Sequence, residues 1–248
     1  MYFTSIASKF NKVRGNEILD TLLDTVKFLH NGTQNWVLDV GAGTGRFSIA
    51  LTKKGFRIIG IDRNAQMLSH AVSNGNTNNQ SFEGVLGAAE NLPFPENSFY
   101  LIVSTNAIHH FNLHPHFQEI SRILKPGGYY IIFSRFHEQN VRSIWGQYFP
   151  LFAEKETRLY NPEDFKRIEN YFPQIKLESI EELKFEVPFS ANRLINEAKS
   201  NKYSTFALYT DEEFKQAFKK FQIDIAKYKC DVQKVETGRI IFRKKLIR

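Results

Sequence analysis

Cysteine is almost absent from this chain, which has one, Cys230, in 248 residues. A single cysteine excludes an intramolecular disulfide framework and a metal site built from several thiolates, so we expect a reducing, cytoplasmic setting. The sequence also lacks an apolar run of about 18 residues, which a membrane-spanning helix would need. Its N-terminus has no charged segment followed by an apolar stretch of about 7–15 residues, as a secretory signal would. We therefore expect a soluble protein without a membrane span.

Acidic residues are scarce in one part of the chain only. The formal net charge is +7, and residues 199–248 hold 13 of the 33 basic but 6 of the 26 acidic side chains, so the whole excess lies there. A basic region can attract nucleic acid, an acidic membrane surface or an anionic substrate. Lys215, Lys219 and Lys220 alternate with phenylalanines, as on an amphipathic helix. A solvated helix face is the interpretation that we favour.

One segment joins an apolar strand pattern directly to a glycine-rich turn. Residues 37–45 read Val-Leu-Asp-Val-Gly-Ala-Gly-Thr-Gly, and a second apolar run over 58–62 ends on Asp62. Glycine lets the backbone turn sharply and approach a ligand closely, and a helix that starts near Gly45 would direct its free N–H groups there. A carboxylate at the end of the second strand can accept both hydroxyls of a ribose. The pattern predicts a nucleotide-cofactor site.

The dinucleotide fingerprint G-x-G-x-x-G is missing, because Arg46 stands where its third glycine would be. This absence opposes a hydride-transferring dehydrogenase. Further segments follow in order: Gly-Ala-Ala-Glu-Asn-Leu-Pro-Phe over 87–94, an apolar strand pattern over 99–104, Asn-Ala-Ile-His-His-Phe over 106–111, and Ile-Leu-Lys-Pro-Gly-Gly over 123–128. The last is a turn that feeds another strand.

Together, these segments resemble the class I S-adenosylmethionine-dependent methyltransferases from about residue 36 to residue 134. The resemblance is closest to the type 11 methyltransferase domain, a group that includes quinone-biosynthesis C-methyltransferases. It implies S-adenosyl-L-methionine as cofactor. The glycines would lie beneath its methionine part and Asn106 beside the methionine end. Asp62 would bind the ribose, and Met67 and the Ala89 backbone N–H would contact the adenine. The implied cofactor-binding set is Asp39, Gly41, Ala42, Gly43, Gly45, Asp62, Arg63, Met67, Ala88, Ala89, Glu90, Asn106 and Ala107.

Two positions depart from this family pattern. Many relatives carry an aspartate where this chain has Ala88, and Phe-Asp where it has Phe99-Tyr100. The first change favours weaker recognition of the adenine amino group, and the second concerns packing more than chemistry.

Apolar runs and helical periodicity alternate along the chain. Strands are predicted near 36–40, 57–61, 81–86, 99–104, 128–134, 176–187 and 235–246, with Gly238 at a turn or bulge, and helices near 16–29, 46–54, 65–74, 114–124 and 211–228. The alternation predicts an α/β, Rossmann-like fold, with a seven-stranded, mostly parallel sheet and helices on both faces. Ligands bind such sheets beyond the carboxyl ends of the strands.

We expect a single domain over 1–248, with a cofactor-binding core over 33–135. An N-terminal helical lid is predicted over 1–32, where the aromatic stripe of Tyr2, Phe3, Ile6, Phe10 and Val13 fits a lid and plain core packing equally well. Helical insertions over 136–175 and 188–232, after the fifth and sixth strands, would cover the substrate. Long insertions that carry their own helices more often build lids than idle loops.

Histidines cluster beside the fourth strand. His109 and His110 are candidate catalytic residues, because one of them could act as a general base near neutral pH; a hydrogen-bonded role in ordering the loop is the alternative. His114 and His116 have too few partners for a metal site, so we predict none and expect their helix to be solvated on that face. Residues that could contact the acceptor are Arg135, His137, Tyr148, Arg158, Tyr203 and Tyr209.

The predicted function is methyl transfer to a small-molecule acceptor by in-line displacement, which needs positioning more than a catalytic triad. The Asn/Asp-Pro-Pro-Tyr/Phe sequence of exocyclic-amine methyltransferases is absent, and Cys230 lies outside the crevice motifs, which disfavours a covalent cysteine mechanism. An RNA (tRNA) methyltransferase is an alternative, because residues 107–111 also resemble a loop of tRNA wobble-uridine methyltransferases. A noncatalytic cofactor-binding protein is another. The sequence sets neither the acceptor nor the oligomeric state.

Overall fold

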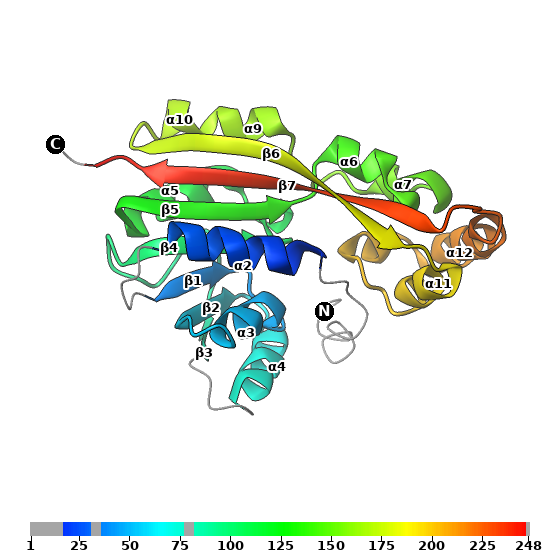
Figure 1. Ribbon diagram of the computed structural model, residues 1–248, viewed down its shortest axis with the longest axis horizontal. Coiled ribbons are helices and arrows are strands. Elements are labelled where there is room, and N and C mark those ends of the chain that lie inside the picture. The colour runs from blue at the N-terminus through cyan, green and yellow to red at the C-terminus, as the bar shows by residue number, and fades with distance from the viewer. Residues whose placement is uncertain (1–16, 31–35, 77–81, 247–248) are drawn as a thin grey trace.

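A seven-stranded sheet forms the centre of the protein (Figure 1). The computed structural model describes residues 17–30, 36–76 and 82–246. The strand order is β3-β2-β1-β4-β5-β7-β6, and β7 runs antiparallel to both neighbours while β1 to β5 are parallel. The strands are β1 Val37–Val40, β2 Ile58–Asp62, β3 Phe82–Leu86, β4 Phe99–Thr105, β5 Leu124–Ser134, β6 Ile175–Pro188 and β7 Val232–Lys244. The predicted α/β fold with a mostly parallel sheet is confirmed.

Helices cover both faces of this sheet because its strands are apolar on both sides. In β1, Val37 faces one hydrophobic core and Leu38 the other, as the two-residue period of a strand requires. One face packs against α2 Glu17–Leu29, α3 Arg46–Thr52 and α4 Ala65–Asn76. The other packs against α5 Leu113–Ile123, α9 Pro162–Lys166 and α10 Ile168–Tyr171. Within the described residues, no helix is long and apolar enough to cross a membrane.

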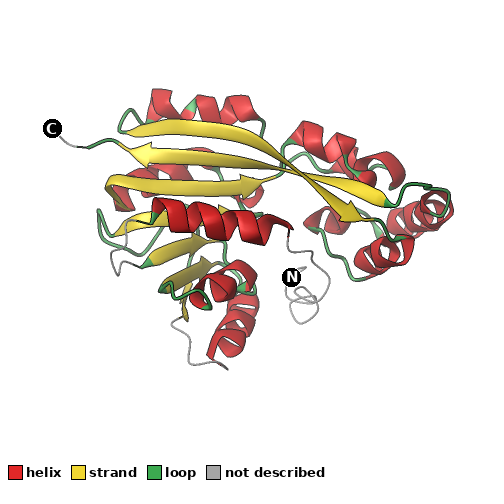
Figure 2. Ribbon diagram, in the orientation of Figure 1, coloured by secondary structure: helices red, strands yellow, loops and turns green. Residues whose placement is uncertain are grey.

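A further group of helices forms a separate body, which we call the roof. It consists of residues 137–155, with α6 His137–Arg142, α7 Ile144–Tyr148 and α8 Phe152–Lys155, and residues 191–225, with α11 Ala191–Lys199, the 3-10 helix η2 Ser204–Leu208 and α12 Asp211–Ile225. The two segments share one hydrophobic core, in which Trp145 stacks on Phe221 at 5.2 Å between ring centroids. Figure 2 shows these helices gathered around one end of the two longest strands.

The second half of the predicted 136–175 insertion lies elsewhere. Phe165, Ile168 and Phe172 are buried in the core of the sheet, and no residue of α9 or α10 lines the cavity described below. These two short helices therefore cover β6 rather than the substrate crevice. The aromatic stripe from Tyr2 to Val13 lies outside the described residues.

Strands β6 and β7 continue beyond β5 as a two-stranded ribbon that reaches the roof (Figure 1). Gly238, predicted at a turn or bulge, instead lies within β7 and pairs with Ser134 and Glu182 where β5 ends. The Phe136 ring occupies the space that a Cβ of residue 238 would need. Glycine is required at position 238 because the Phe136 ring packs closely against the backbone there, and not because the chain turns.

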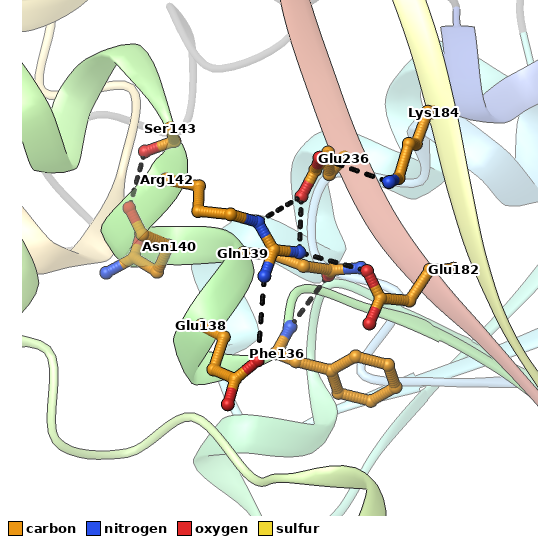
Figure 3. A network of polar contacts seen from close by, with 9 residues as sticks. All are labelled: Phe136, Glu138, Gln139, Asn140, Arg142, Ser143, Glu182, Lys184 and Glu236. Carbon is orange, nitrogen blue, oxygen red and sulfur yellow. Dashed lines mark hydrogen bonds and ion pairs between the residues drawn. The ribbon is translucent and has the colours of Figure 1, made fainter.

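Arg142 joins α6 to the ribbon (Figure 3). Its guanidinium donates to Glu236 at 2.7 Å and to Glu182 at 2.9 Å, and Glu138 lies 3.5 Å away. Exposed ion pairs each contribute little, but a shared cation loses its side-chain entropy only once. The network fixes the first roof helix against both strands of the ribbon.

Candidate active site

The carboxyl ends of all five parallel strands open into one cavity of about 490 Å³. Gly41 follows β1, Asp62 ends β2, Gly87 follows β3, Asn106 follows β4 and Arg135 follows β5, and each of them lines it. The opposite wall comes from the roof and the ribbon. Pockets of this size hold small ligands, and this sheet edge is where open α/β folds bind them.

The glycine turn after β1 uses the backbone freedom of glycine. Gly41 and Gly43 have φ of 78° and 56°, in the left-handed region that side chains disfavour. A Cβ on Gly41 would also meet the side chain of Ala107 and stand 2.9 Å from the Phe111 ring. The Gly41 N–H donates to Ile61 O at 2.8 Å, which joins the turn to β2.

Asp62 organises the backbone on both sides of it. Its carboxylate accepts from the N–H of Gly43 and from that of Asn64, each at 2.8 Å. Burial raises its pKa, and these hydrogen bonds act against that rise. Asn64, which the sequence analysis did not single out, accepts from the N–H groups of Gln66 and Met67 at the start of α4. An asparagine directly before a helical pattern is a recognisable capping signal.

Asp39 lies beneath the cavity and is 2% exposed. Burial raises its pKa to about 6, while the Ser48 hydroxyl, which donates to it at 2.5 Å, acts in the opposite direction. The nearby charge of Asp62 adds to the rise.

His116 supports the segment that carries Ala89 and Glu90. Its Nδ1 lies 2.9 Å from Ala89 O and its Nε2 lies 2.8 Å from Tyr130 Oη, so the neutral ring donates to the carbonyl and accepts from the phenol. The expectation of a solvated face is wrong for His116, which is fully buried, whereas His114 is exposed and contacts Tyr171 and Phe172 with its ring. Burial lowers the pKa of His116 to about 4.

We predict that His116→Phe lowers the free energy of unfolding at pH 7.5 by about 1–3 kcal/mol, because Ala89 O and Tyr130 Oη lose their partners. This deficit should narrow as the pH falls from about 6.5 to 4. In that window His116 binds a proton in the unfolded wild type but not in the folded protein. The free energy of unfolding of the wild type therefore falls, whereas that of the variant is unaffected by this residue. Urea unfolding at several pH values measures both effects. Asp39 and Asp62, whose raised pKa values act with the opposite sign, are common to both proteins and cancel.

The matched control is the double variant His116→Phe/Tyr130→Phe, which removes the orphaned hydroxyl and should recover part of the loss at pH 7.5. A deficit that stays constant from pH 7.5 to pH 4 would contradict the assignment of a neutral buried imidazole.

The predicted histidine pair follows β4 in the 3-10 helix η1, Ile108–His110. Asn106 precedes it with φ of 55°, a left-handed conformation held by its N–H bond to Phe133 O at 2.7 Å. Strained backbone of this kind is typical of ligand sites. Both His109 and His110 line the cavity. Burial lowers the pKa of His110 to about 4, and the charge of Arg158 lowers it further than the charge of Glu156 raises it.

The structure brings most of the predicted site residues together, with six exceptions. Of the cofactor set, only Gly45 and Ala88 do not line the cavity: Gly45 is fitted closely against Ala71, and Ala88 bridges to Asn91. Arg135 and Tyr203 line it, and the Arg135 guanidinium lies 5.9 Å from the Tyr203 ring centroid. His137, Tyr148, Arg158 and Tyr209 do not line it. Tyr148 and Tyr209 pack on the roof core instead.

Several cavity residues on the side of the roof and the ribbon escaped sequence reasoning. Glu156 accepts from Arg158 at 2.5 Å and from Thr205 at 2.6 Å, and Glu197 accepts from Lys202 at 2.7 Å. Burial raises the pKa of Glu156, but these donors outweigh it and leave the pKa below its usual range. Arg193 and Lys234 are among the other charged residues that were missed. The sequence alone does not distinguish a charged residue of an insertion that faces solvent from one that faces a cavity.

Residues 38–132 match the family described as methyltransferase domain. The chain is 35% identical to the uncharacterized methyltransferase YcgJ of Bacillus subtilis over 100 residues, 39% of each protein. It is 32% identical to CRG1 of Saccharomyces cerevisiae, assigned as an S-adenosylmethionine-dependent methyltransferase, over 126 residues that cover 49% of this chain and 43% of CRG1. The chain thus spans about two fifths of the length of these relatives.

Solved structures agree over nearly the full length. A protein from Anabaena variabilis, assigned as a methyltransferase of an antibiotic biosynthesis pathway, superposes with a TM-score of 0.73 at 22% identity, covering 95% of this chain and 99% of that one. At this identity the match concerns the fold. Motif order, sheet topology and the family match agree, and residues 38–132 therefore form a methyltransferase domain.

Proposed function

We propose that this protein transfers the methyl group of S-adenosylmethionine to a small-molecule acceptor. The observation that carries the proposal is a shared cavity, which has the strand-end residues on one wall and the roof on the other. A donor on the first wall and an acceptor against the second would share an enclosed space of a size suited to small ligands.

The residues of the first wall fit this cofactor. Asp62 offers carboxylate oxygens to ribose hydroxyls, Met67 and Ala89 offer apolar surface to an adenine, and the glycine turn admits a ligand against bare backbone. Bound there, the cofactor would supply a methyl group on a positively charged sulfur, which is already an activated leaving group. The protein then has to orient the acceptor, exclude water and hold any proton that is released.

His109 and His110 line the cavity beyond the end of β4, where they would contact the acceptor. A group with a pKa of about 4 is neutral at pH 7 and gains a proton only weakly, so we assign to His110 an orienting hydrogen bond. His109 is the proposed proton acceptor. Trp145, Phe152 and Tyr203 would cover the acceptor with aromatic surface and keep water out.

The basic excess of residues 199–248 gives less support to an RNA acceptor than the composition suggests. Lys244 is buried and donates to Asn97 Oδ1, Ser121 O and Leu124 O. Arg239 pairs with Glu181, and Lys220 and Lys227 pair with Asp224. These cations serve structural contacts, which leaves a smaller basic surface for a polyanion.

Incubation of the purified protein with methyl-labelled S-adenosylmethionine and fractionated cell extract tests the proposal. We expect label in low-mass compounds, which ribonuclease does not remove. Label that ribonuclease releases would support the RNA alternative, and binding of S-adenosylhomocysteine without transfer to any fraction would support a noncatalytic cofactor-binding protein. Either result would overturn the small-molecule assignment.

A further inference from the structure

The carboxylates on the roof side of the cavity are already neutralised by the protein. Glu156 and Glu197 are 3% and 2% exposed and pair with Arg158 and Lys202. Glu236, from the ribbon, pairs with Arg142. None of the three presents an uncompensated negative charge to a ligand.

Two arginines that reach the roof side have no carboxylate partner among the described side chains. Arg135 follows β5 on the strand-end wall, but its guanidinium lies 5.9 Å from the ring centroid of Tyr203 in the roof, and Arg193 lies on α11. None of the ion pairs between described side chains includes either guanidinium. Both arginines line the cavity, so its roof side carries an excess of positive charge.

Arg193 is held in place without being neutralised. One guanidinium N–H donates to Pro188 O at 3.1 Å, while its Nε is buried without an acceptor. Glu197 is one helical turn along α11, where an ion pair with Arg193 would be expected, but it is bound to Lys202 instead. A buried donor without an acceptor costs free energy that a ligand oxygen could recover.

We propose that Arg135 and Arg193 form an anion subsite for the acceptor, which therefore carries a carboxylate or phosphate group on an apolar or aromatic body. This inference rests on the proposed function for its assignment of the roof side to the acceptor. A guanidinium matches the two oxygens of a carboxylate or phosphate, and a partly enclosed site strengthens the attraction. The aromatic residues Trp145, Phe152 and Tyr203 of the same wall contact the rest of the molecule.

Ligand-detected NMR titrations of the S-adenosylhomocysteine-loaded protein with benzoate, phenyl phosphate and neutral benzamide test the subsite. We expect at least one of the anions to bind at least tenfold more tightly than benzamide. Preference between the two anions tells carboxylate from phosphate. Arg135→Gln and Arg193→Gln should each weaken binding of that anion about tenfold, equivalent to about 1.4 kcal/mol, and leave the S-adenosylhomocysteine affinity within about twofold. Arg167→Gln, which removes an arginine outside the cavity, is the matched control and should change neither.

The outcomes separate the two proposals. Failure of the wild type to bind S-adenosylhomocysteine, with anion binding still dependent on both arginines, would remove the proposed function and keep the subsite. Normal S-adenosylhomocysteine binding with no preference for anions over benzamide would overturn the subsite alone. If Arg135→Gln or Arg193→Gln lost affinity for S-adenosylhomocysteine while anion binding stayed unchanged, that arginine would belong to the cofactor site. This result would also overturn the proposed anion subsite.

Discussion

Replacement of Asp62 by alanine is expected to weaken binding of S-adenosylmethionine and S-adenosylhomocysteine at least about tenfold, a loss of roughly 1.4 kcal/mol. The change removes the carboxylate proposed to accept the ribose hydroxyls. It also frees the N–H groups of Gly43 and Asn64, which that carboxylate holds at 2.8 Å on either side. The glycine turn and the start of α4 would then be less well ordered before the ligand binds. Isothermal titration calorimetry measures the affinities directly.

Two controls make this result specific. Glu83→Ala removes an exposed carboxylate from β3, outside the cavity, and should leave both affinities unchanged. Asp62→Asn keeps one acceptor oxygen and should fall between the wild type and Asp62→Ala. Affinities of Asp62→Ala within about twofold of the wild type would remove Asp62 from the proposed cofactor site.

Replacement of Phe221 by alanine should lower the free energy of unfolding of the roof by about 3–5 kcal/mol, the usual cost of truncating a buried aromatic ring. Phe221 is fully buried, and its ring centroid lies 5.2 Å from those of Trp145 and Phe149. It belongs to α12, whereas its two neighbours precede β6, so the cavity left behind would separate the two segments of the roof. Phe221 does not line the ligand cavity.

Trp145 provides the measurement, because the chain has two tryptophans and the other, Trp36, can be replaced by phenylalanine. Urea unfolding followed by Trp145 fluorescence should show a lower midpoint for Phe221→Ala in the Trp36→Phe background. Phe218→Ala, on the half-buried side of the same helix, should cost clearly less. A loss below about 1 kcal/mol at Phe221 would contradict a shared core for the two segments.

The sheet and its ligand-binding edge could be predicted from the sequence because local pattern and tertiary placement agree there. An apolar run that ends in glycines has few alternatives, and parallel strands carry their carboxyl ends to one edge. Asp62 was found by this logic without knowledge of any contact, and Asn106 was found through the family resemblance. Asn64 could have been found from its capping position, and Gly45 was included only because it belongs to the same motif.

The roof could not be predicted in the same detail. Helical periodicity in residues 136–175 is the same whether a helix packs on the sheet, as α9 and α10 do, or on the roof. Arg193 and Glu197 resemble the polar face of a solvated helix, and they line a cavity because α11 belongs to the roof core, which also includes Trp145 from a distant segment. His116 was expected in solvent because the sequence does not reveal that Tyr130 lies behind it. These are long-range contacts, which local patterns do not encode.

The shared core of the roof has a consequence for the order in which a newly made chain can assemble. All five parallel strands and the glycine turn are complete once Ser134 has been synthesised. Trp145, Phe149 and Phe152 come next, but their partners Phe206 and Phe221 follow only after the whole of β6. During synthesis from the N-terminus, an aromatic surface therefore stays uncovered until α12 has left the ribosome. Segments released before that point would expose this surface to other chains, which makes α12 the element that ends the period of greatest aggregation risk.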